Sequence, residues 1–82
     1  DIRKKRDVME IVHSLLKNAI GGIKKTRLLY KSNLNTKTLE KYLSYCIKQG
    51  YIQIRGENKL YITTEKGREA LEKLREASEL LA

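Results

Sequence analysis

KKTRLLYKSNLNTKTLEKYLSYCIKQG, residues 24–50, contains two helical patterns separated by a tight turn. Leu28, Leu29 and Tyr30 give the first pattern, about residues 24–32, an apolar side. The polar turn at residues 32–35 includes Leu34, and an apolar residue there is typical of a side chain held between two crossing helices. Two helices joined by so short a turn predict a helix-turn-helix unit.

The second helical pattern, residues 36–49, has a clear start and a clear end. Asn35 is placed to cap it by accepting a hydrogen bond from the backbone N–H of Lys37 or Thr38. Gly50 supplies the stop at the other end. The spacing predicts a buried stripe made of Leu39, Tyr42, Leu43, Cys46 and Ile47. The residues left facing outward are Thr36, Lys37, Glu40, Lys41, Ser44, Tyr45 and Lys48.

The segments on either side complete the predicted fold. Residues 3–17 carry apolar residues every three or four positions, which predicts a helix packed behind the pair; these are Val8, Ile11, Val12, Leu15 and Leu16. Residues 51–55 and 59–63 alternate and are rich in β-forming residues, so they predict a β-hairpin. Its turn is at residues 56–58, where Asn58 suits a positive φ. Either Leu60 with Ile62 or Tyr61 with Thr63 faces inward.

Thr64 is the expected cap of a last helix that runs to about residue 81. The element order predicts a mainly α fold with a β-hairpin: a winged helix-turn-helix with a three-helix core, a wing and a C-terminal helix.

Charge is distributed unevenly along the chain. The net charge is +8, but residues 64–82 hold four basic and five acidic residues, so residues 1–63 carry +9. A concentrated positive face attracts a polyanion and gains free energy by releasing its counterions. The same charge is also compatible with a plain solubility surface, so charge alone does not decide the function.

The sequence resembles the small archaeal winged-helix DNA-binding proteins, both chromatin-type and regulator-like. The resemblance covers nearly the whole chain and depends on residues 23–35 (IKKTRLLYKSNLN), 39–43 (LEKYL), 49–52 (QGYI) and 62–67 (ITTEKG). It implies a homodimer joined through the final helix as an antiparallel coiled coil. We therefore expect residues 1–63 to be a DNA-binding domain and residues 64–82 to be a dimerisation element.

A helix fits the major groove of B-DNA, with its N-terminal side chains at the base edges. In residues 36–49 these side chains are Thr36, Lys37, Lys41 and Ser44, with Glu40 counting against contact at its own position. No Arg lies on that strip, and Asn35 is used as the cap, so we expect a weak sequence preference. An ordinary solvated helix face is the alternative.

Further basic residues extend the expected interface. Lys24, Lys25 and Arg27 lie at the start of the short helix and are suited to bind backbone phosphates. For Lys31 the sequence does not decide between a DNA contact and a plain surface position. Arg55 and Lys59 flank the wing turn and suit the backbone or the minor groove. Residues 3–6 (RKKR) form a basic cluster that is either an N-terminal arm binding phosphates or a frayed chain end.

The tyrosines divide into two groups. Tyr30, Tyr42, Tyr51 and Tyr61 are expected in the core. Tyr45 is expected to point outward and to contact DNA, unless the last helix covers it.

In the last helix, Leu71, Leu74, Ser78 and Leu81 follow a 3-4-3 spacing that predicts a dimer contact. The alternative is a helix packed only on its own domain.

Catalysis is not expected. The sequence has no P-loop, no paired carboxylates in an apolar context and no metal-ligand spacing, so no cofactor or metal is expected. The single cysteine, Cys46, suits a reducing cytoplasmic, nucleoid-associated setting, and no apolar run is long enough to span a membrane. Double-stranded DNA is the expected partner; the rival is a protein-binding module of a transcription complex, and RNA is a third option.

Overall fold

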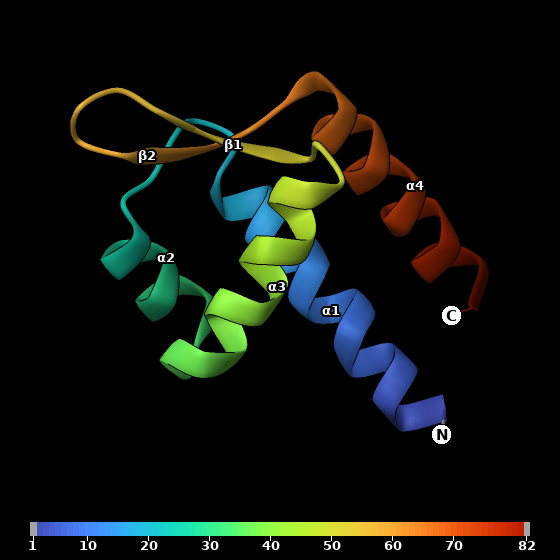
Figure 1. The fold of residues 1–82 in the computed structure, drawn as a ribbon. Helices are drawn as coiled ribbons and strands as arrows, with labels where there is room; N and C mark the ends of the chain where they lie inside the picture. The colour runs from blue at the N-terminus through green and yellow to red at the C-terminus, as the bar shows by residue number, and fades with distance from the viewer. Residues whose placement is uncertain (1, 82) are drawn as a thin grey trace.

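The computed structural model describes the backbone of residues 2–81 and the side chains of residues 8–80. Its elements are α1 (Ile2–Asn18), α2 (Lys25–Ser32), α3 (Thr36–Lys48), β1 (Ile52–Arg55), β2 (Leu60–Thr63) and α4 (Glu65–Leu81). In Figure 1, α1 crosses behind α3, α4 lies beside α1, and the hairpin projects to the side of α2. The element order is the predicted one, and each boundary falls within about two residues of its expected place.

The hydrophobic core lies where α1, α2 and α3 meet. Four leucines there are fully shielded from solvent: Leu15, Leu16, Leu28 and Leu39. Ile52 of β1 and Cys46 of α3 close the same cluster. Complete burial of an aliphatic side chain contributes about 1.5–3 kcal/mol, so these residues fix how α3 sits on the other helices. Leu34 packs on the core from the turn before α3, as expected.

Three apolar side chains lie outside the core that the sequence pattern assigned to it. Tyr30 is 80% exposed because Leu28 and Leu29 already occupy the inward face of the short α2. Ile47 and Val8 are each 38% exposed, since each lies at the edge of its helix's buried stripe.

The hairpin is antiparallel, and Ile52 pairs with Thr63 at its base. Thr63 is buried and Tyr61 packs on the core, so the alternative with these two residues inward is confirmed. The turn takes its positive φ at Gly56 (76°) and Lys59 (50°), and the expectation of a positive φ at Asn58 is wrong. The backbone of Tyr61 also exchanges two hydrogen bonds with Ile23, at 2.8 and 3.0 Å, which fastens β2 to the segment before α2.

Two threonines anchor the end of the hairpin to the helices. The hydroxyl of Thr63 donates to the carbonyl of Leu16 at 2.7 Å inside the core. The hydroxyl of Thr64 donates to the carbonyl of Gly50 at 2.6 Å and accepts from the backbone N–H of Gly67 at 3.0 Å. Thr64 therefore caps α4 as predicted and also joins this helix to the C-terminal end of α3.

Candidate nucleic-acid interface

One face of α3 is buried and the opposite face carries its basic side chains. Leu39, Leu43 and Cys46 point into the core. Burial raises the pKa of the Cys46 thiol to about 11, so this residue is an inert apolar group at neutral pH. Three lysines and a serine form the outer strip, which we define as Lys37, Lys41, Ser44 and Lys48. Their spacing of four, three and four residues places them on one line along the helix, and all four are exposed.

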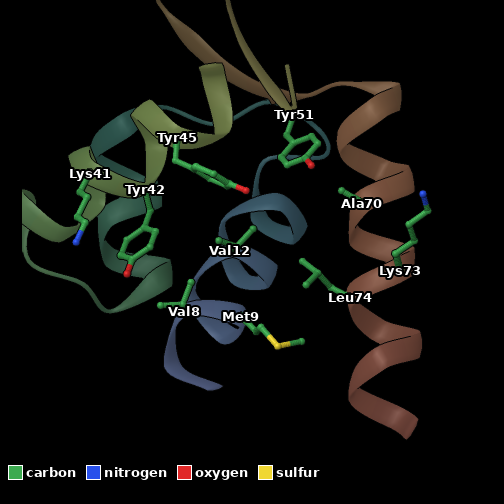
Figure 2. Close-up of a pocket in the computed structure, with 10 residues that line it drawn as sticks. All are labelled: Val8, Met9, Val12, Lys41, Tyr42, Tyr45, Tyr51, Ala70, Lys73 and Leu74. Atoms are coloured by element: carbon green, nitrogen blue, oxygen red, sulfur yellow. The ribbon is translucent and has the colours of Figure 1, made fainter. Parts of the chain in front are cut away.

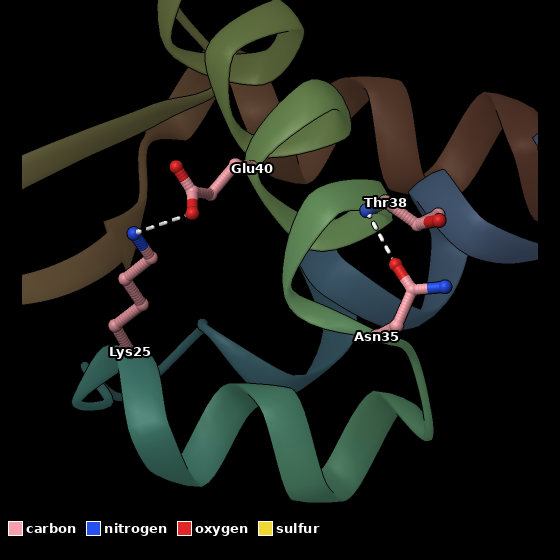
Figure 3. A network of polar contacts seen from close by, with 4 residues as sticks. All are labelled: Lys25, Asn35, Thr38 and Glu40. Atoms are coloured by element: carbon pink, nitrogen blue, oxygen red, sulfur yellow. Dashed lines mark hydrogen bonds and ion pairs between the residues drawn. The ribbon is translucent and has the colours of Figure 1, made fainter.

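The start of α3 is fixed by the predicted cap. The side chain of Asn35 accepts a hydrogen bond from the backbone N–H of Thr38 at 2.8 Å, as Figure 3 shows. Thr36 follows the cap and is exposed in the first turn. The cap therefore sets the register in which Thr36 and the outer strip are presented to solvent.

The basic residues of α2 lie next to the start of α3, and one of them is neutralised. The ammonium of Lys25 lies 3.8 Å from a carboxylate oxygen of Glu40, and both side chains are about half exposed, at 42% and 56%. Figure 3 shows this pair bridging α2 and α3. Lys24 precedes α2 and makes no capping hydrogen bond, and both it and Arg27 are exposed. Lys25 is therefore the one predicted contact in this group that must first leave an acidic partner.

Two exposed residues of α3 each lie near an aromatic ring. Tyr45 is 47% exposed, and its ring meets that of Tyr51 edge-on, with the centroids 6.4 Å apart. The ammonium of Lys41 lies 5.6 Å from the centroid of the Tyr42 ring. In Figure 2, Tyr45 points toward Tyr51 and α4. Tyr45 is thus exposed as expected, but it lies beside the outer strip and not on it.

The wing presents its two basic residues at the turn. Arg55 and Lys59 are both exposed. With its amide oxygen turned toward Arg55, the side chain of Gln53 accepts hydrogen bonds from the guanidinium at 2.9 and 3.1 Å. Gln53 is therefore placed to orient Arg55 along the hairpin. The basic cluster at residues 3–6 lies outside the side chains that the structure describes.

Two exposed residues were not among the predicted contacts. Lys48 continues the outer strip one turn beyond Ser44, and its separation of eleven residues from Lys37, three helical turns, was the sequence signal that could have found it. Tyr30 lies between Arg27 and Lys31 on the exposed side of α2. Its position opposite Leu28 on the helix was the corresponding signal.

The residues predicted for dimerisation do not share one environment. Leu71 and Leu74 are half-buried and pack against the chain's own core. Ser78 is exposed, and the side chain of Leu81 lies outside the described residues. Leu80, next to it, is 86% exposed. Two of the four predicted residues, Leu71 and Leu74, are therefore partly buried against the chain's own core.

The described part of the chain holds neither a metal site nor a membrane-spanning helix. Among the described residues, no group of three His, Cys, Asp or Glu side chains is placed to hold a metal ion. No helix between residues 2 and 81 is both long enough and apolar enough to cross a membrane.

The chain matches a family model, a relative and a solved structure. The family model described as winged helix-turn-helix matches residues 5–82. The uncharacterized protein MJ0290 of Methanocaldococcus jannaschii is 35% identical over 78 residues, which cover 94% of this chain but 36% of that protein. The crystal structure of Sso10a-2, described as a DNA-binding protein from Sulfolobus solfataricus, matches with a TM-score of 0.81 and 32% identity. That match covers 88% of this chain and 78% of the other, and this chain spans about a third of the length of the Methanocaldococcus relative.

Proposed function

This chain belongs to the winged helix-turn-helix family, and we propose that it binds double-stranded DNA without catalysing a reaction. The similarity to archaeal proteins of this fold, predicted from the sequence, is confirmed by the comparisons, and so is the fold class. The observation that carries the proposal is the outer strip of α3, a line of exposed cations on a helix whose other face is fixed in the core. The major groove of B-DNA is wide enough to admit such a helix.

The proposed contacts follow from exposure and charge. Thr36, Lys37, Lys41 and Ser44 reach base edges or phosphates from α3, and Lys48 adds a phosphate contact at its far end. Lys24 and Arg27 bind phosphates from the start of α2, where Lys25 joins them only after leaving Glu40. Tyr45 contacts the backbone at the edge of the strip. Arg55 and Lys59 follow the backbone or the minor groove.

This set of contacts favours affinity over sequence discrimination. Lysine and hydroxyl groups on α3 bind phosphates well, but a bidentate reader of guanine or adenine needs Arg, Asn or Gln. The α3 strip contains none of these. We therefore place the protein among nucleoid-associated or broadly acting regulatory proteins, located in the cytoplasm with the DNA.

A homodimer through residues 64–82 is the second part of the proposal. Leu71 and Leu74 keep part of their surface exposed, and Ser78 and Leu80 extend that surface toward the end of α4. Two copies joined there as a coiled coil would present α3 to successive grooves, about 34 Å apart. Sedimentation that gives a monomer at high protein concentration would remove this part and leave the DNA proposal standing.

Alanine substitution along α3 tests the proposal. Lys37→Ala and Lys48→Ala should each weaken binding to duplex DNA while leaving the melting temperature almost unchanged, because both side chains are exposed. Arg68→Ala, an exposed cation of α4, removes the same charge away from the strip and is the matched control. If the control weakens binding as much as the strip variants, α3 is not in the groove. If duplex RNA binds as well as duplex DNA, insertion of α3 is excluded, because a helix cannot enter the major groove of A-form RNA.

A further inference from the structure

A groove lies where α1, α3 and α4 meet, and its volume is about 480 Å³. Val12 of α1 and Leu74 of α4 supply aliphatic surface. The rings of Tyr42, Tyr45 and Tyr51 line the side formed by α3 and the segment after it, as Figure 2 shows. Most of the surface that lines the groove is apolar. An amphipathic helix binds a groove of this kind by laying its apolar face into it.

The apolar line that α4 contributes to the groove continues past it, toward the end of the helix. Ala70 and Lys73 line the groove, and the residues seven positions after them are Ala77 and Leu80. Seven residues are close to two helical turns, so Ala77 and Leu80 lie on the groove side of α4. Leu80 is 86% exposed, so its own chain leaves it almost uncovered. The chain therefore carries an apolar groove and an uncovered leucine on the same side of one helix.

The charges around the groove and those near the end of α4 have opposite signs. Lys41 and Lys73 are the charged residues among the described residues that line the groove. Figure 2 shows their ammonium groups at opposite ends of the groove and turned away from it, so they can meet charges at the flanks of a docked helix. Residues 76–80 contain Glu76 and Glu79 and no basic residue. Glu76 is exposed one helical turn before Leu80, at the flank of the apolar line.

We propose that the groove is the docking site for the end of α4 from a second copy of this chain, with the partner's Leu80 placed among the tyrosine rings. This inference rests on the homodimer part of the proposed function and specifies its contact. A coiled coil of two α4 helices relies on Leu71 and Leu74, which pack against their own core. In a two-fold symmetric pair both copies offer the same surfaces, so each groove receives the other copy's leucine.

Two-fold symmetry also gives a register for this contact. Consider two copies of α4 that cross antiparallel with the symmetry axis at Ala77. Leu80 follows the axis by three residues and Leu74 precedes it by three, so each Leu80 lies opposite the Leu74 of the other copy. Because Leu74 lines the groove, this crossing directs the partner's Leu80 into it. The residue at the axis is an alanine, whose small side chain lets the two helices approach closely.

Nuclear Overhauser effects between copies test the contact directly. Isotope-filtered spectra of a mixture of labelled and unlabelled whole chains report contacts between copies only. The Leu80 methyl groups should show effects to the Val12 methyl groups and to the ring of Tyr45 or Tyr51. Effects that join Leu80 only to α4 of the partner indicate a plain coiled coil and overturn the groove contact, while the homodimer stands. A chain that sediments as a monomer at the same concentration overturns both and leaves the DNA proposal untouched.

Exposed substitutions separate the docking contact from the fold. Leu80→Ser should weaken self-association at least about ten-fold, because the burial of one leucine per copy is lost. Its melting temperature at low concentration should not change, because the side chain is exposed. Tyr30→Ser removes a large side chain of α2 that is 80% exposed and is the matched control. If Leu80→Ser self-associates like the parent, or Tyr30→Ser weakens self-association as much, the docking contact is overturned.

A charge reversal tests the flank of the docked helix. Glu76→Lys should weaken self-association about two- to five-fold, because it brings a cation to a groove whose charged residues are lysines. Glu57→Lys makes the same change of charge at an exposed position of the wing and should have no effect. Equal self-association of the Glu76→Lys and Glu57→Lys variants would contradict the proposed seating of α4 in the groove.

Discussion

Replacing Glu40 by Gln should strengthen DNA binding, although Glu40 makes the ion pair that joins α2 to α3. The carboxylate of Glu40 lies 3.8 Å from the Lys25 ammonium, and both groups are about half exposed. An exposed pair of this kind contributes about 0.2–1 kcal/mol, so its loss should lower the free energy of unfolding by less than about 1 kcal/mol. The glutamine is nearly isosteric and keeps the packing of α3.

The gain in binding has two sources. In the proposed complex, the variant removes a negative charge that would face the phosphates, and it frees Lys25 to contact one of them. If these effects together are of the same size as an exposed ion pair, affinity should rise about two- to five-fold at low salt. One further phosphate contact should steepen the log–log dependence of affinity on salt by about 0.9.

Fluorescence anisotropy with a labelled duplex, recorded between about 50 and 200 mM salt, measures both quantities. Glu69→Gln, an exposed carboxylate of α4, changes the net charge by the same amount and should have a smaller effect. Adding Lys25→Gln to the Glu40→Gln variant should remove the extra slope. If Glu40→Gln leaves both affinity and slope unchanged, or weakens binding, the start of α3 does not face the phosphates.

Three further predictions concern the fold. Gly67→Ala should lower stability by about 1–3 kcal/mol or more, measured by urea unfolding, because a Cβ at this position would lie 2.2 Å from the carbonyl oxygen of Tyr51; a neutral substitution would mean that α4 is not seated there. Thr63→Val should cost about 1–3 kcal/mol, because it leaves the buried carbonyl of Leu16 without its donor, and an unchanged melting temperature would contradict that bond. Burial raises the pKa of Cys46 from 9.0 to about 11, so the free energy of unfolding should not depend on this thiol below pH 9 and should fall by roughly 2–3 kcal/mol between pH 9 and 11, because the unfolded thiol ionises first; the difference in unfolding free energy between the parent protein and Cys46→Ala, followed against pH, separates this effect from the ionisation of the tyrosines.

Local patterns were sufficient to predict the architecture from the sequence. The Asn35 and Thr64 caps, the glycine stops and the helical and alternating periodicities each act over a few residues, and every predicted element is present in the structure. Periodicity was less informative at the edges of the stripes. Tyr30, Val8 and Ile47 are exposed because neighbouring leucines fill the inward faces first, which depends on how the helices pack and not on spacing alone.

Part of the candidate interface could also be predicted from the sequence, because helical spacing shows which side chains share a face. Helical spacing predicted that Thr36, Lys37, Lys41 and Ser44 face outward together, and all four are exposed. The Lys25–Glu40 pair joins two helices across the turn, so no pattern within a single helix predicts it. The lean of Tyr45 toward Tyr51 and the groove beneath it likewise depend on where α4 returns to α1 and α3.

The central claim, that the cations of α3, α2 and the wing bind duplex phosphates, is tested most directly by the salt dependence of DNA affinity. Seven exposed cations make up the proposed set: Lys24, Arg27, Lys37, Lys41, Lys48, Arg55 and Lys59. If all of them engage phosphates, the log–log slope approaches about −6. A slope near zero, or no detectable binding at low salt, would contradict the account.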